Sequence, residues 1–396
     1  MFFKKKIDLV ILAGGKGSRI KKFLKNYPKP MIKVNNKHFL NYILKNACSF
    51  NFEKAFILTG YRSKIIFNKY HKKVFNFVKL FCIEEKKEMG TGGALFNLKK
   101  KLNDFILING DTFFDIDYKN LVNLNNRKSI GNIALTKNKE QKSLKLNSIS
   151  IKNGLLSYSK KSPFMNGGVY FFKKKFLNFI PNKKCSLENE ILPELIKKKK
   201  IEGKKFSNFF LDIGSKEKLK SSPKLIKKNL KRPSVFLDRD GVINHDYGYV
   251  HSFAKFKFKK GVIKGLKYLT KKNFHIFIVT NQAGIGKGKF TYKSFEKLHK
   301  SLKLIFIMNN IKISDVEFSP FHPNAKLIRY KKKSNTRKPG NLMIENILKN
   351  WDVEKKESFM IGDQKKDFLA AKKSKLRFFY AEKDFFKQIK RIVNSY

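Results

Sequence analysis

The chain has 396 residues, 41% of them hydrophobic, which exceeds one average domain and is enough for two separate cores. Its 89 lysines and arginines outnumber the 30 aspartates and glutamates to give a formal net charge of +59, so a positive field should attract polyanionic substrates. No apolar run is long enough to cross a bilayer and the three cysteines show no paired spacing, which argues against a membrane protein, a disulfide framework and a zinc knuckle.

The first predicted element is a strand over residues 7–14, IDLVILAG, which follows MFFKKK directly. A secretory signal would need an apolar core and a cleavage site there, so a cytoplasmic protein without membrane insertion is expected. Strand-like and helix-like runs then alternate through most of the chain, which is typical of α/β folds. In open α/β sheets, ligands bind at the carboxyl ends of the strands, so candidate functional residues are sought where strands stop.

A glycine-rich turn follows this strand, with the sequence GGKGSR over residues 14–19. Glycine lets backbone N–H groups approach a phosphate closely, and the lysine and arginine supply compensating charge. Further on, Lys29 lies between two prolines, which favours a rigid presentation of its side chain. Two later strands end in Asp111 and Asp212. The pattern predicts a phosphate site with Mg²⁺ bridging the two carboxylates, and solvated loop acids are the alternative.

These features resemble the nucleoside-diphosphate-sugar pyrophosphorylases over residues 7–220, and within them the guanylyltransferases that act on D-glycero-α-D-manno-heptose 1-phosphate. The motifs fall in the family's order: LAGGKGSRI, YPKPMIKV, GTGGAL, LINGDTFFDID, MNGGVYFF, SLENEILPELI and LDIGS. The resemblance implies a Rossmann-like domain with a mixed, mostly parallel sheet. It also implies in-line attack of a sugar 1-phosphate on the α-phosphorus of a nucleoside triphosphate, which needs positioning and charge neutralisation but no protein nucleophile.

The same resemblance implies roles for the residues that match family motifs. Arg19 and Lys29 would act in catalysis, and Asp111 and Asp212 would bind Mg²⁺. Substrate contacts are expected from several motifs, at Gly14, Gly15, Gly17, Ser18, Gly90, Thr91, Gly92, Gly93, Asn166, Gly167 and either Glu188 or Glu190. Ser18 replaces the family's usual threonine and keeps its hydroxyl. A lysine that contacts the sugar phosphate is expected at residue 160 or 161, and the sequence leaves both open.

The α/β pattern weakens over residues 215–233, a charged segment with two prolines that precedes a new apolar strand, SVFLD. The predicted organisation is a first domain over residues 1–222, a linker over 223–232 and a second domain over 233–396. Buried parallel strands are then predicted at HIFIVTN and SFMIGD.

The second half carries polar residues at each of its predicted strand ends. SVFLD leads into Asp238-Arg239-Asp240-Gly241, where one carboxylate could attack phosphorus while the other transfers protons. A polar Asp-Gly turn is the alternative. Thr280-Asn281 follows the next strand, Arg337-Lys338 precedes a helix, and Asp363 ends the last strand with Asp367 one helical turn on. Together they predict a phosphoryl-transfer site with a nucleophile, an acid/base, a phosphate clamp and a metal ligand.

Over residues 232–385 the chain resembles the haloacid-dehalogenase-like phosphatases, and within them the heptose bisphosphate phosphatases. The matching motifs are DRDGVINHDYGYVHS, TNQAGIGKGKF, FHP, RKPG and MIGDQKKD. The resemblance implies a Rossmannoid domain with a minimal cap, with Asp238 as nucleophile and Asp240 as acid/base. Mg²⁺ would be held by Asp238, by the backbone carbonyl of Asp240 and by Asp363. The phosphate would be held by residues of the next two motifs, Thr280, Asn281, Arg337 and Lys338.

One loop departs from this family, whose members usually bind zinc through a Cys-x-His pair and a Cys-x-Cys pair. The equivalent positions here read Ser319, Phe321, Ser334 and Thr336. None of these can serve as a normal zinc ligand, so no zinc is expected and the loop should be held by packing around Phe321. His322 remains, and a lone histidine beside a proline is interpreted as structural. Gln364 replaces a lysine that is common in the family.

The two halves are thus expected to catalyse consecutive steps on small molecules, a sugar phosphate and a nucleoside triphosphate, with Mg²⁺ in both. The second half would remove the 7-phosphate of D-glycero-D-manno-heptose 1,7-bisphosphate, and the first would couple the 1-phosphate to GTP. The alternatives are another sugar or nucleotide, a histidinol-phosphate-type phosphatase, or a basic nucleic-acid-binding protein. A nucleic-acid-binding protein is disfavoured because the basic residues are mostly lysine and are spread along the whole chain. Every predicted catalytic carboxylate is also present in the sequence.

Overall fold

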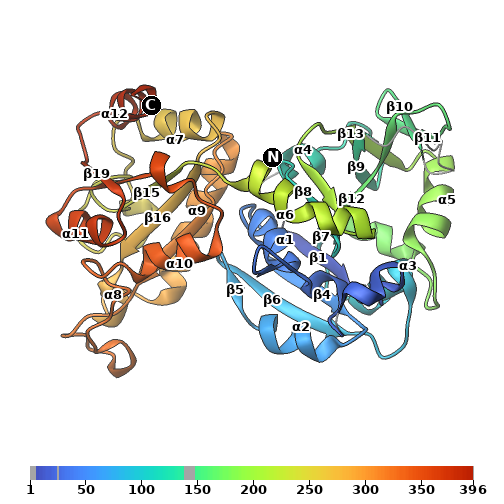
Figure 1. Cartoon of the computed structure of the whole chain (residues 1–396), viewed down its shortest axis with the longest axis horizontal. Helices are drawn as coiled ribbons and strands as arrows, with labels where there is room; N and C mark the ends of the chain where they lie inside the picture. Colours follow the sequence, from blue (N-terminus) through green and yellow to red (C-terminus); the bar gives the residue numbers. More distant parts are fainter. Residues whose placement is uncertain (1–5, 25, 138–147, 396) are drawn as a thin grey trace. The chain divides into compact units, whose positions relative to one another are not determined.

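The computed structural model describes residues 6–24, 26–137 and 148–395. The chain divides into two compact units, with the main division between Lys224 and Leu225 (Figure 1). Each unit has its own sheet and its own hydrophobic core. Among the described residues, no helix combines the length and the apolar character that crossing a membrane requires.

The division falls inside a helix, α6 (Lys216–Leu230), which covers most of the segment that the sequence assigned to a linker. Pro223 lies within this helix and cannot donate a hydrogen bond to the carbonyl four residues earlier, that of Leu219. The buried Ser222 hydroxyl donates to that carbonyl at 2.7 Å instead. The helix therefore continues through a proline that usually ends one.

The first unit contains a ten-stranded mixed sheet in the order β10-β11-β13-β9-β12-β7-β1-β4-β6-β5. Its strands are β1 (Ile7–Ala13), β4 (Lys54–Thr59), β5 (Val74–Phe75), β6 (Val78–Glu84), β7 (Asp104–Asn109), β9 (Gly131–Lys137), β10 (Ile149–Lys152), β11 (Leu155–Tyr158), β12 (Phe164–Phe172) and β13 (Ile201–Lys205). The neighbouring strands β7, β1, β4 and β6 are parallel. The predicted Rossmann-like mixed sheet is confirmed.

Smaller elements surround this sheet. Two two-stranded sheets pair β2 (Lys33–Val34) with β3 (Lys37–His38) and β8 (Thr112–Phe114) with β14 (Phe210–Asp212). The helices are α1 (Phe39–Cys48), α2 (Ser63–Tyr70), α3 (Gly90–Gly93), α4 (Tyr118–Val122) and α5 (Leu192–Lys197). Short 3-10 or π turns are η2 (Ser18–Phe23), η3 (Lys29–Met31), η4 (Ala94–Leu98), η5 (Lys174–Phe179) and η6 (Leu187–Ile191).

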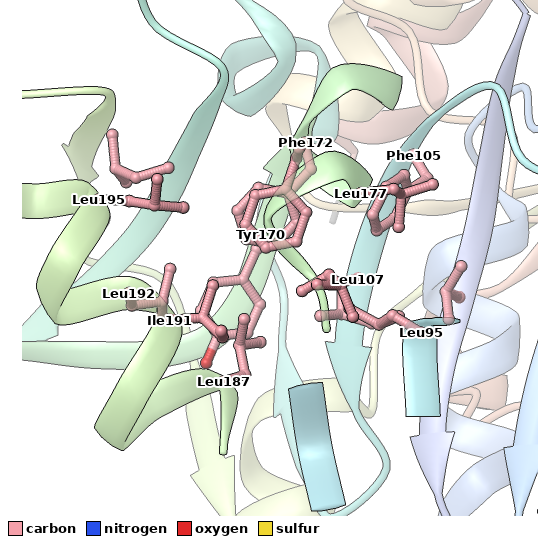
Figure 2. Packing of buried hydrophobic residues seen from close by; sticks show 14 of the residues in the cluster. Leu95, Phe105, Leu107, Tyr170, Phe172, Leu177, Leu187, Ile191, Leu192 and Leu195 are labelled. Carbon is pink, nitrogen blue, oxygen red and sulfur yellow. The ribbon is translucent and has the colours of Figure 1, made fainter. Parts of the chain in front are cut away.

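The core of the first unit is built from β7 and β12 and the helical turns packed on them (Figure 2). The rings of Phe172 and Phe176 are stacked with centroids 3.7 Å apart. Tyr170 is also buried in this cluster, and its hydroxyl points toward Leu187 and Ile191 in Figure 2. The register of β12 against β9 shifts between Asn166 and Tyr170, so the strand changes direction where the NGG motif lies.

The second unit has five parallel strands in the order β17-β16-β15-β18-β19. They are β15 (Ser234–Leu237), β16 (His275–Asn281), β17 (Asp315–Ser319), β18 (Phe359–Gly362) and β19 (Arg377–Tyr380), with helices α7 (Val262–Lys271), α8 (Ala283–Gly286), α9 (Tyr292–Met308), α10 (Leu342–Asn350), α11 (Lys365–Lys373) and α12 (Phe385–Asn394). Two 3-10 turns of this unit are η8 (Ile328–Tyr330) and η9 (Lys355–Glu357).

Helices flank this sheet (Figure 1), and alternate strand residues pack against two different sets of them. Val235 and Leu237 pack with residues of α7, α9 and α12, whereas Phe236 packs with residues of α10 and α11. Between β15 and α7 the described chain forms one 3-10 turn, η7 (Phe253–Lys255), as a minimal cap requires. The predicted haloacid-dehalogenase-like architecture is confirmed, and β15 lies at the point where the strand order reverses.

Candidate active sites

A cavity of about 620 Å³ lies at the carboxyl ends of the parallel strands of the first unit. Residues that follow β1, β4, β6 and β7 line it, among them the glycine-rich turn and the ends of the later strands. The predicted site residues in its lining are Gly14, Gly15, Gly17, Ser18, Lys29, Gly90, Thr91 and Asp111. A pocket of this size suits a nucleotide or a sugar phosphate.

Asp111 and Asp212 lie side by side in this unit. Strands β8 and β14 pair Asp212 with Thr112, and the Ile213 N–H donates to the Asp111 carbonyl at 3.1 Å. Lys29 forms an ion pair with the Asp111 carboxylate. Burial and then the Asp111 charge raise the pKa of Asp212, whereas Lys29 lowers it. Two adjacent carboxylates of which one raises the pKa of the other are a donor set that a divalent cation would stabilise, so the residues fit Mg²⁺.

The predicted sugar-site residues meet through a tyrosine that the sequence reasoning missed. Glu188 accepts hydrogen bonds from the Thr91 hydroxyl at 2.7 Å and from the Tyr170 hydroxyl at 3.3 Å. Asn166 donates to the same Tyr170 oxygen at 2.9 Å. Glu190 instead accepts from the backbone N–H of Ser186 at 2.7 Å and lies exposed, so the geometry favours Glu188 of the two alternatives.

Some predicted residues of the first unit occupy other surroundings. Gly92 and Gly93 are buried against the loop that holds Cys185 and lie outside the cavity lining, as does Gly167 within β12. Residues 160 and 161 are both exposed in the turn that follows β11. Gly17 has φ +62° and a Cβ there would lie 2.8 Å from Leu24, so this turn requires glycine. The side chain of Arg19 lies outside the described part of the chain.

Glu85, which follows β6, is a further acidic residue in the cavity lining that the sequence reasoning missed. Its Oε1 would lie 2.9 Å from a Cβ built on Gly14, so the carboxylate is against the glycine-rich turn. Burial raises the pKa of Glu85, and a backbone hydrogen bond from Met89 lowers it. In the same loop Glu88 is exposed and pairs with Lys16 at 3.0 Å and Lys184 at 3.2 Å. Glu85 is therefore the more deeply placed acid of this loop.

In the second unit three carboxylates gather at the carboxyl end of β15. One oxygen each from Asp238, Asp363 and Asp367 lie within 4.8 Å of one another. The ammonium group of Lys338 lies 2.9 Å from Asp238 and 2.6 Å from Asp367, and its side chain is fully buried. Burial raises the pKa of Asp238 to about 6, with Lys338 opposing the rise and Asp367 adding to it.

The surroundings of Asp363 fit a metal ion. Its Oδ1 is buried and has no hydrogen-bond partner among the described residues. Gly241 has φ +84°, and a Cβ there would lie 2.2 Å from Asp363 Oδ2, so only glycine lets this carboxylate approach the DRDG turn. A buried carboxylate oxygen that lacks a donor and faces two further acids is the kind of ligand Mg²⁺ takes.

Asp240 is held by three neighbouring side chains. Its oxygens accept hydrogen bonds from Arg239 Nη2 at 2.8 Å, from Gln282 at 2.9 Å and from Asn244 at 3.0 Å. The Thr280 hydroxyl is buried and accepts from Gln282 at 2.9 Å. The arrangement fixes one carboxylate of the DRDG turn beside the buried Asp238.

The residues predicted to hold the phosphate differ in whether their side chains are already engaged by other protein groups. Asn281 exchanges two hydrogen bonds with the backbone of Lys338, at 2.9 and 3.0 Å, so it positions the lysine. Arg337 is half-buried, and its Nη1 has no hydrogen-bond partner among the described residues. Gln364 is the N-cap residue of α11, and its backbone N–H donates to Asp367 Oδ2 at 3.0 Å and so helps to fix that acid.

The loop that departs from the zinc-binding pattern is held by hydroxyls and rings. Thr336 Oγ1 lies 3.0 Å from Ser319 Oγ and 2.9 Å from Ser334 Oγ. Phe321 packs edge-on against Tyr330 with centroids 5.7 Å apart, and an ammonium group, that of Lys332, lies over its ring. Hydroxyl oxygens and an aromatic pair do not make a zinc site, and the absence of zinc stays a prediction.

Comparisons with known proteins agree with these two sites. Residues 9–229 match the family described as nucleotidyl transferase, and residues 325–381 match the family described as haloacid dehalogenase-like hydrolase. The fold and the sites thus define a chain that joins a nucleotidyltransferase domain to a haloacid-dehalogenase-like phosphatase domain.

Relatives of the second half carry a more specific name. The D-glycero-beta-D-manno-heptose-1,7-bisphosphate 7-phosphatase of Rhodopseudomonas palustris is 36% identical over 142 residues, which are 36% of this chain and 79% of that protein. The protein of the same name from Escherichia coli K12 is 35% identical over 139 residues, 35% of this chain and 73% of that one. The chain therefore belongs to the nucleotidyl transferase family and, through its second half, to the family of these 7-phosphatases.

Among solved structures, HddC from Yersinia pseudotuberculosis shares 28% identity with a TM-score of 0.48, covering 55% of this chain and 98% of that one.

Proposed function

We propose that the chain is a bifunctional enzyme of nucleotide-activated heptose synthesis. The second unit removes the 7-phosphate of D-glycero-D-manno-heptose 1,7-bisphosphate. The first unit transfers GMP from GTP to the resulting heptose 1-phosphate and releases pyrophosphate. The observation that carries the proposal is that one chain holds two carboxylate and lysine sites, each at the carboxyl ends of the strands of its own sheet.

In the phosphatase reaction, an Asp238 oxygen attacks the phosphorus of the 7-phosphate while the bond to the sugar oxygen breaks. Asp240 donates a proton to the departing oxygen. It then takes a proton from the water that hydrolyses the aspartyl-phosphate. Lys338 offsets negative charge beside the nucleophile. Mg²⁺, for which Asp238, Asp363 and the Asp240 carbonyl are the expected ligands, would supply further charge neutralisation.

In the transferase reaction, an oxygen of the sugar 1-phosphate attacks the α-phosphorus of the triphosphate and pyrophosphate leaves. The chain's task is to align the two substrates and to balance their charge. Lys29 lines the pocket beside the Asp111–Asp212 pair, where it can stabilise charge that develops on phosphorus oxygens. Glu188, which accepts hydrogen bonds from Thr91 and Tyr170, is proposed to accept further hydrogen bonds from sugar hydroxyls. Mg²⁺ at the two aspartates would neutralise phosphate charge.

Glu85 supports GTP as the nucleotide. Guanine presents two adjacent N–H donors on its pairing edge, and a carboxylate has two acceptor oxygens to meet them. Uracil and thymine present one donor between two carbonyl oxygens, which a carboxylate repels. Glu85 lies within the cavity against the turn that follows β1, and its partial burial strengthens such contacts.

The sugar's anomeric form is the second point of specificity. The first half's resemblance implies the α anomer, whereas the names of the second half's relatives specify the β anomer. The 7-phosphatase reaction takes place far from C1, so the first unit sets the requirement for the chain as a whole. We infer GDP-D-glycero-α-D-manno-heptose as the product, a donor for surface glycans such as lipopolysaccharide. We infer the cytoplasm as the site of synthesis, where GTP is made and where the buried free cysteines stay reduced.

The proposal is tested by two separate assays on the purified chain with Mg²⁺. Phosphate release is measured from both anomers of the heptose bisphosphate and from histidinol phosphate, and pyrophosphate release is measured with GTP, ATP, CTP and UTP against a panel of sugar 1-phosphates. The expected best substrates are the heptose bisphosphate and the pair GTP and heptose α-1-phosphate. A higher kcat/KM for histidinol phosphate, or for another sugar 1-phosphate, would overturn the corresponding half.

A further inference from the structure

The residue between the two aspartates of the DRDG turn is a fully buried arginine. Burying a guanidinium costs free energy unless its N–H groups have hydrogen-bond partners. The N–H groups of Arg239 have partners on two edges of the guanidinium. Nε and Nη2 donate to Asp240, at 3.1 Å to Oδ1 and 2.8 Å to Oδ2 respectively, and Nη2 also donates to the Val250 carbonyl at 2.7 Å. On the other side, Nη1 lies 3.3 Å from Nε2 of His299.

His299 can meet this arginine only as an acceptor. A guanidinium carries donors and no acceptor, so the His299 Nε2 must be unprotonated and the ring proton must lie on Nδ1. Burial, and then the Arg239 charge, lower the pKa of His299 well below its ordinary value, which keeps the ring neutral. One helical turn earlier on α9, the ring of Phe295 faces the same guanidinium at 5.8 Å.

We propose that His299 is a positioning residue for the phosphatase reaction. By accepting the hydrogen bond from Nη1 it fixes the plane of the Arg239 guanidinium, whose opposite edge holds both oxygens of Asp240. The acid/base carboxylate thereby stays aimed at the oxygen of the departing alcohol. This inference rests on the proposed phosphatase function and adds a residue, from a helix that no sequence motif marked, to the machinery that orients its proton donor.

The contribution of His299 is partial because Gln282 and Asn244 also hold Asp240. A positioned general acid contributes roughly 10²- to 10⁴-fold, so loss of one of several restraints should cost about tenfold. The loss should depend on the leaving group. A sugar alkoxide needs a proton as it departs, whereas p-nitrophenolate leaves without one.

The test compares His299→Leu, which fills a similar volume without an acceptor, with His299→Gln, which keeps an acceptor oxygen. The first-turnover rate of substrate cleavage is measured on the heptose bisphosphate and on p-nitrophenyl phosphate, in the full chain. His299→Leu should slow the sugar substrate about tenfold and the aryl substrate less than about twofold, with KM unchanged, and His299→Gln should recover most of the loss.

Two controls separate positioning from folding. Pyrophosphate release by the first unit measures how much intact chain each preparation contains. His275→Gln alters another buried histidine of the second unit, which lies within hydrogen-bonding distance of Ser314 and of the Leu230 carbonyl, and should change neither substrate selectively. Equal losses on both substrates, or no recovery in His299→Gln, would overturn the role of His299. If the chain hydrolyses other alkyl phosphates but not the heptose bisphosphate, the proposed substrate is wrong, and the role of His299 is tested on those alkyl esters instead. If it hydrolyses no phosphate monoester, both the proposed phosphatase function and the role of His299 are wrong.

Discussion

The two candidate sites differ in how far their charged side chains are removed from water. In the first unit the side chains of Lys29 and Asp111 are 14% and 32% exposed to solvent, and both line the cavity. In the second unit the side chains of Lys338 and Asp367 are fully buried, and that of Asp238 is 8% exposed.

This difference matches two kinds of phosphorus chemistry. A reaction that joins two polyanionic substrates needs room and mobile counter-charge, because the substrates supply both the nucleophile and the leaving group. A reaction through a protein nucleophile needs a carboxylate that is poorly solvated and held in place, and burial raises the pKa of such a carboxylate, as it does for Asp238. The effects of mutations should therefore separate by unit and be largest where burial is greatest.

The largest expected effect comes from Asp238→Asn. Because the amide cannot form the aspartyl-phosphate, phosphate release should fall by at least about 10³-fold while pyrophosphate release is unchanged. Asp246→Asn, the same chemical change at an exposed position of the following loop, is the matched control. Parallel phosphate and pyrophosphate assays measure the result. Phosphatase activity that survives in Asp238→Asn would refute its assignment as nucleophile.

Asp212→Asn should give the converse separation. Loss of one carboxylate from the pair should lower pyrophosphate release by roughly 10²- to 10³-fold and raise the Mg²⁺ concentration it needs, with phosphate release unaffected. The control is Asp117→Asn, because asparagine caps helix α4 as well as aspartate does. Titration of both activities with Mg²⁺ measures the change. An unchanged Mg²⁺ requirement of the transferase in Asp212→Asn would exclude this aspartate as a metal ligand.

Glu85→Gln should alter base choice more than rate. The amide replaces one acceptor with a donor, so the preference for GTP over UTP, as a ratio of kcat/KM, should fall by about tenfold or more. Glu88→Gln changes an exposed acid of the same loop that pairs with lysines, and it should leave the ratio unchanged. Competition between the two triphosphates in one reaction gives the ratio directly. The proposal that Glu85 reads the base fails if both variants behave alike.

The smallest effect concerns a half-buried acid outside either site, Glu317 on β17. Its partial burial and the charge of Asp315 raise its pKa to about 7. A raised folded-state pKa gives stability that is present below the unfolded value of about 4.5 and is lost as pH rises through about 7. Between pH 6 and 8 the second unit should lose about 1 kcal/mol of unfolding free energy, and Glu317→Gln should not lose that share. Calorimetric unfolding at both pH values measures this, and equal slopes in the two proteins would contradict it.

Much of both sites could be predicted because parallel strands bring their carboxyl ends to one edge. Asp111, Asp238 and Asp363 each end a predicted strand, and the structure places each beside another carboxylate. The residues that tertiary packing brings next to these carboxylates were harder to recognise in the sequence. Arg239 is one basic residue in a strongly basic chain, and its full burial is visible only in three dimensions. Tyr170 is one polar aromatic in the apolar strand VYFF.

Two further differences have local causes. The charged segment with Pro223 and Pro233 indicates a linker, but the hydroxyl of Ser222 replaces the hydrogen bond that Pro223 removes. Side-chain compensation of this kind cannot be inferred from composition. Asp367 lies one helical turn beyond Asp363 in the sequence, but the sequence gives it no metal-binding or catalytic role. Its ion pair with Lys338 joins two separate segments: Asn281 at the end of β16 holds Lys338, whereas Asp367 lies in the helix that follows β18, so only the fold brings them together.

The central claim is that one chain carries out both steps in order. The most direct measurement is a ³¹P NMR time course of the purified chain with heptose 1,7-bisphosphate, supplied separately as each anomer, together with GTP and Mg²⁺. With the α anomer, the account predicts that phosphate appears first, followed by pyrophosphate and a GDP-sugar in equal amounts, and that Asp238→Asn stops all three. Pyrophosphate formed from the α-bisphosphate by Asp238→Asn, or phosphate release from the α anomer that no GDP-sugar follows, would contradict the account.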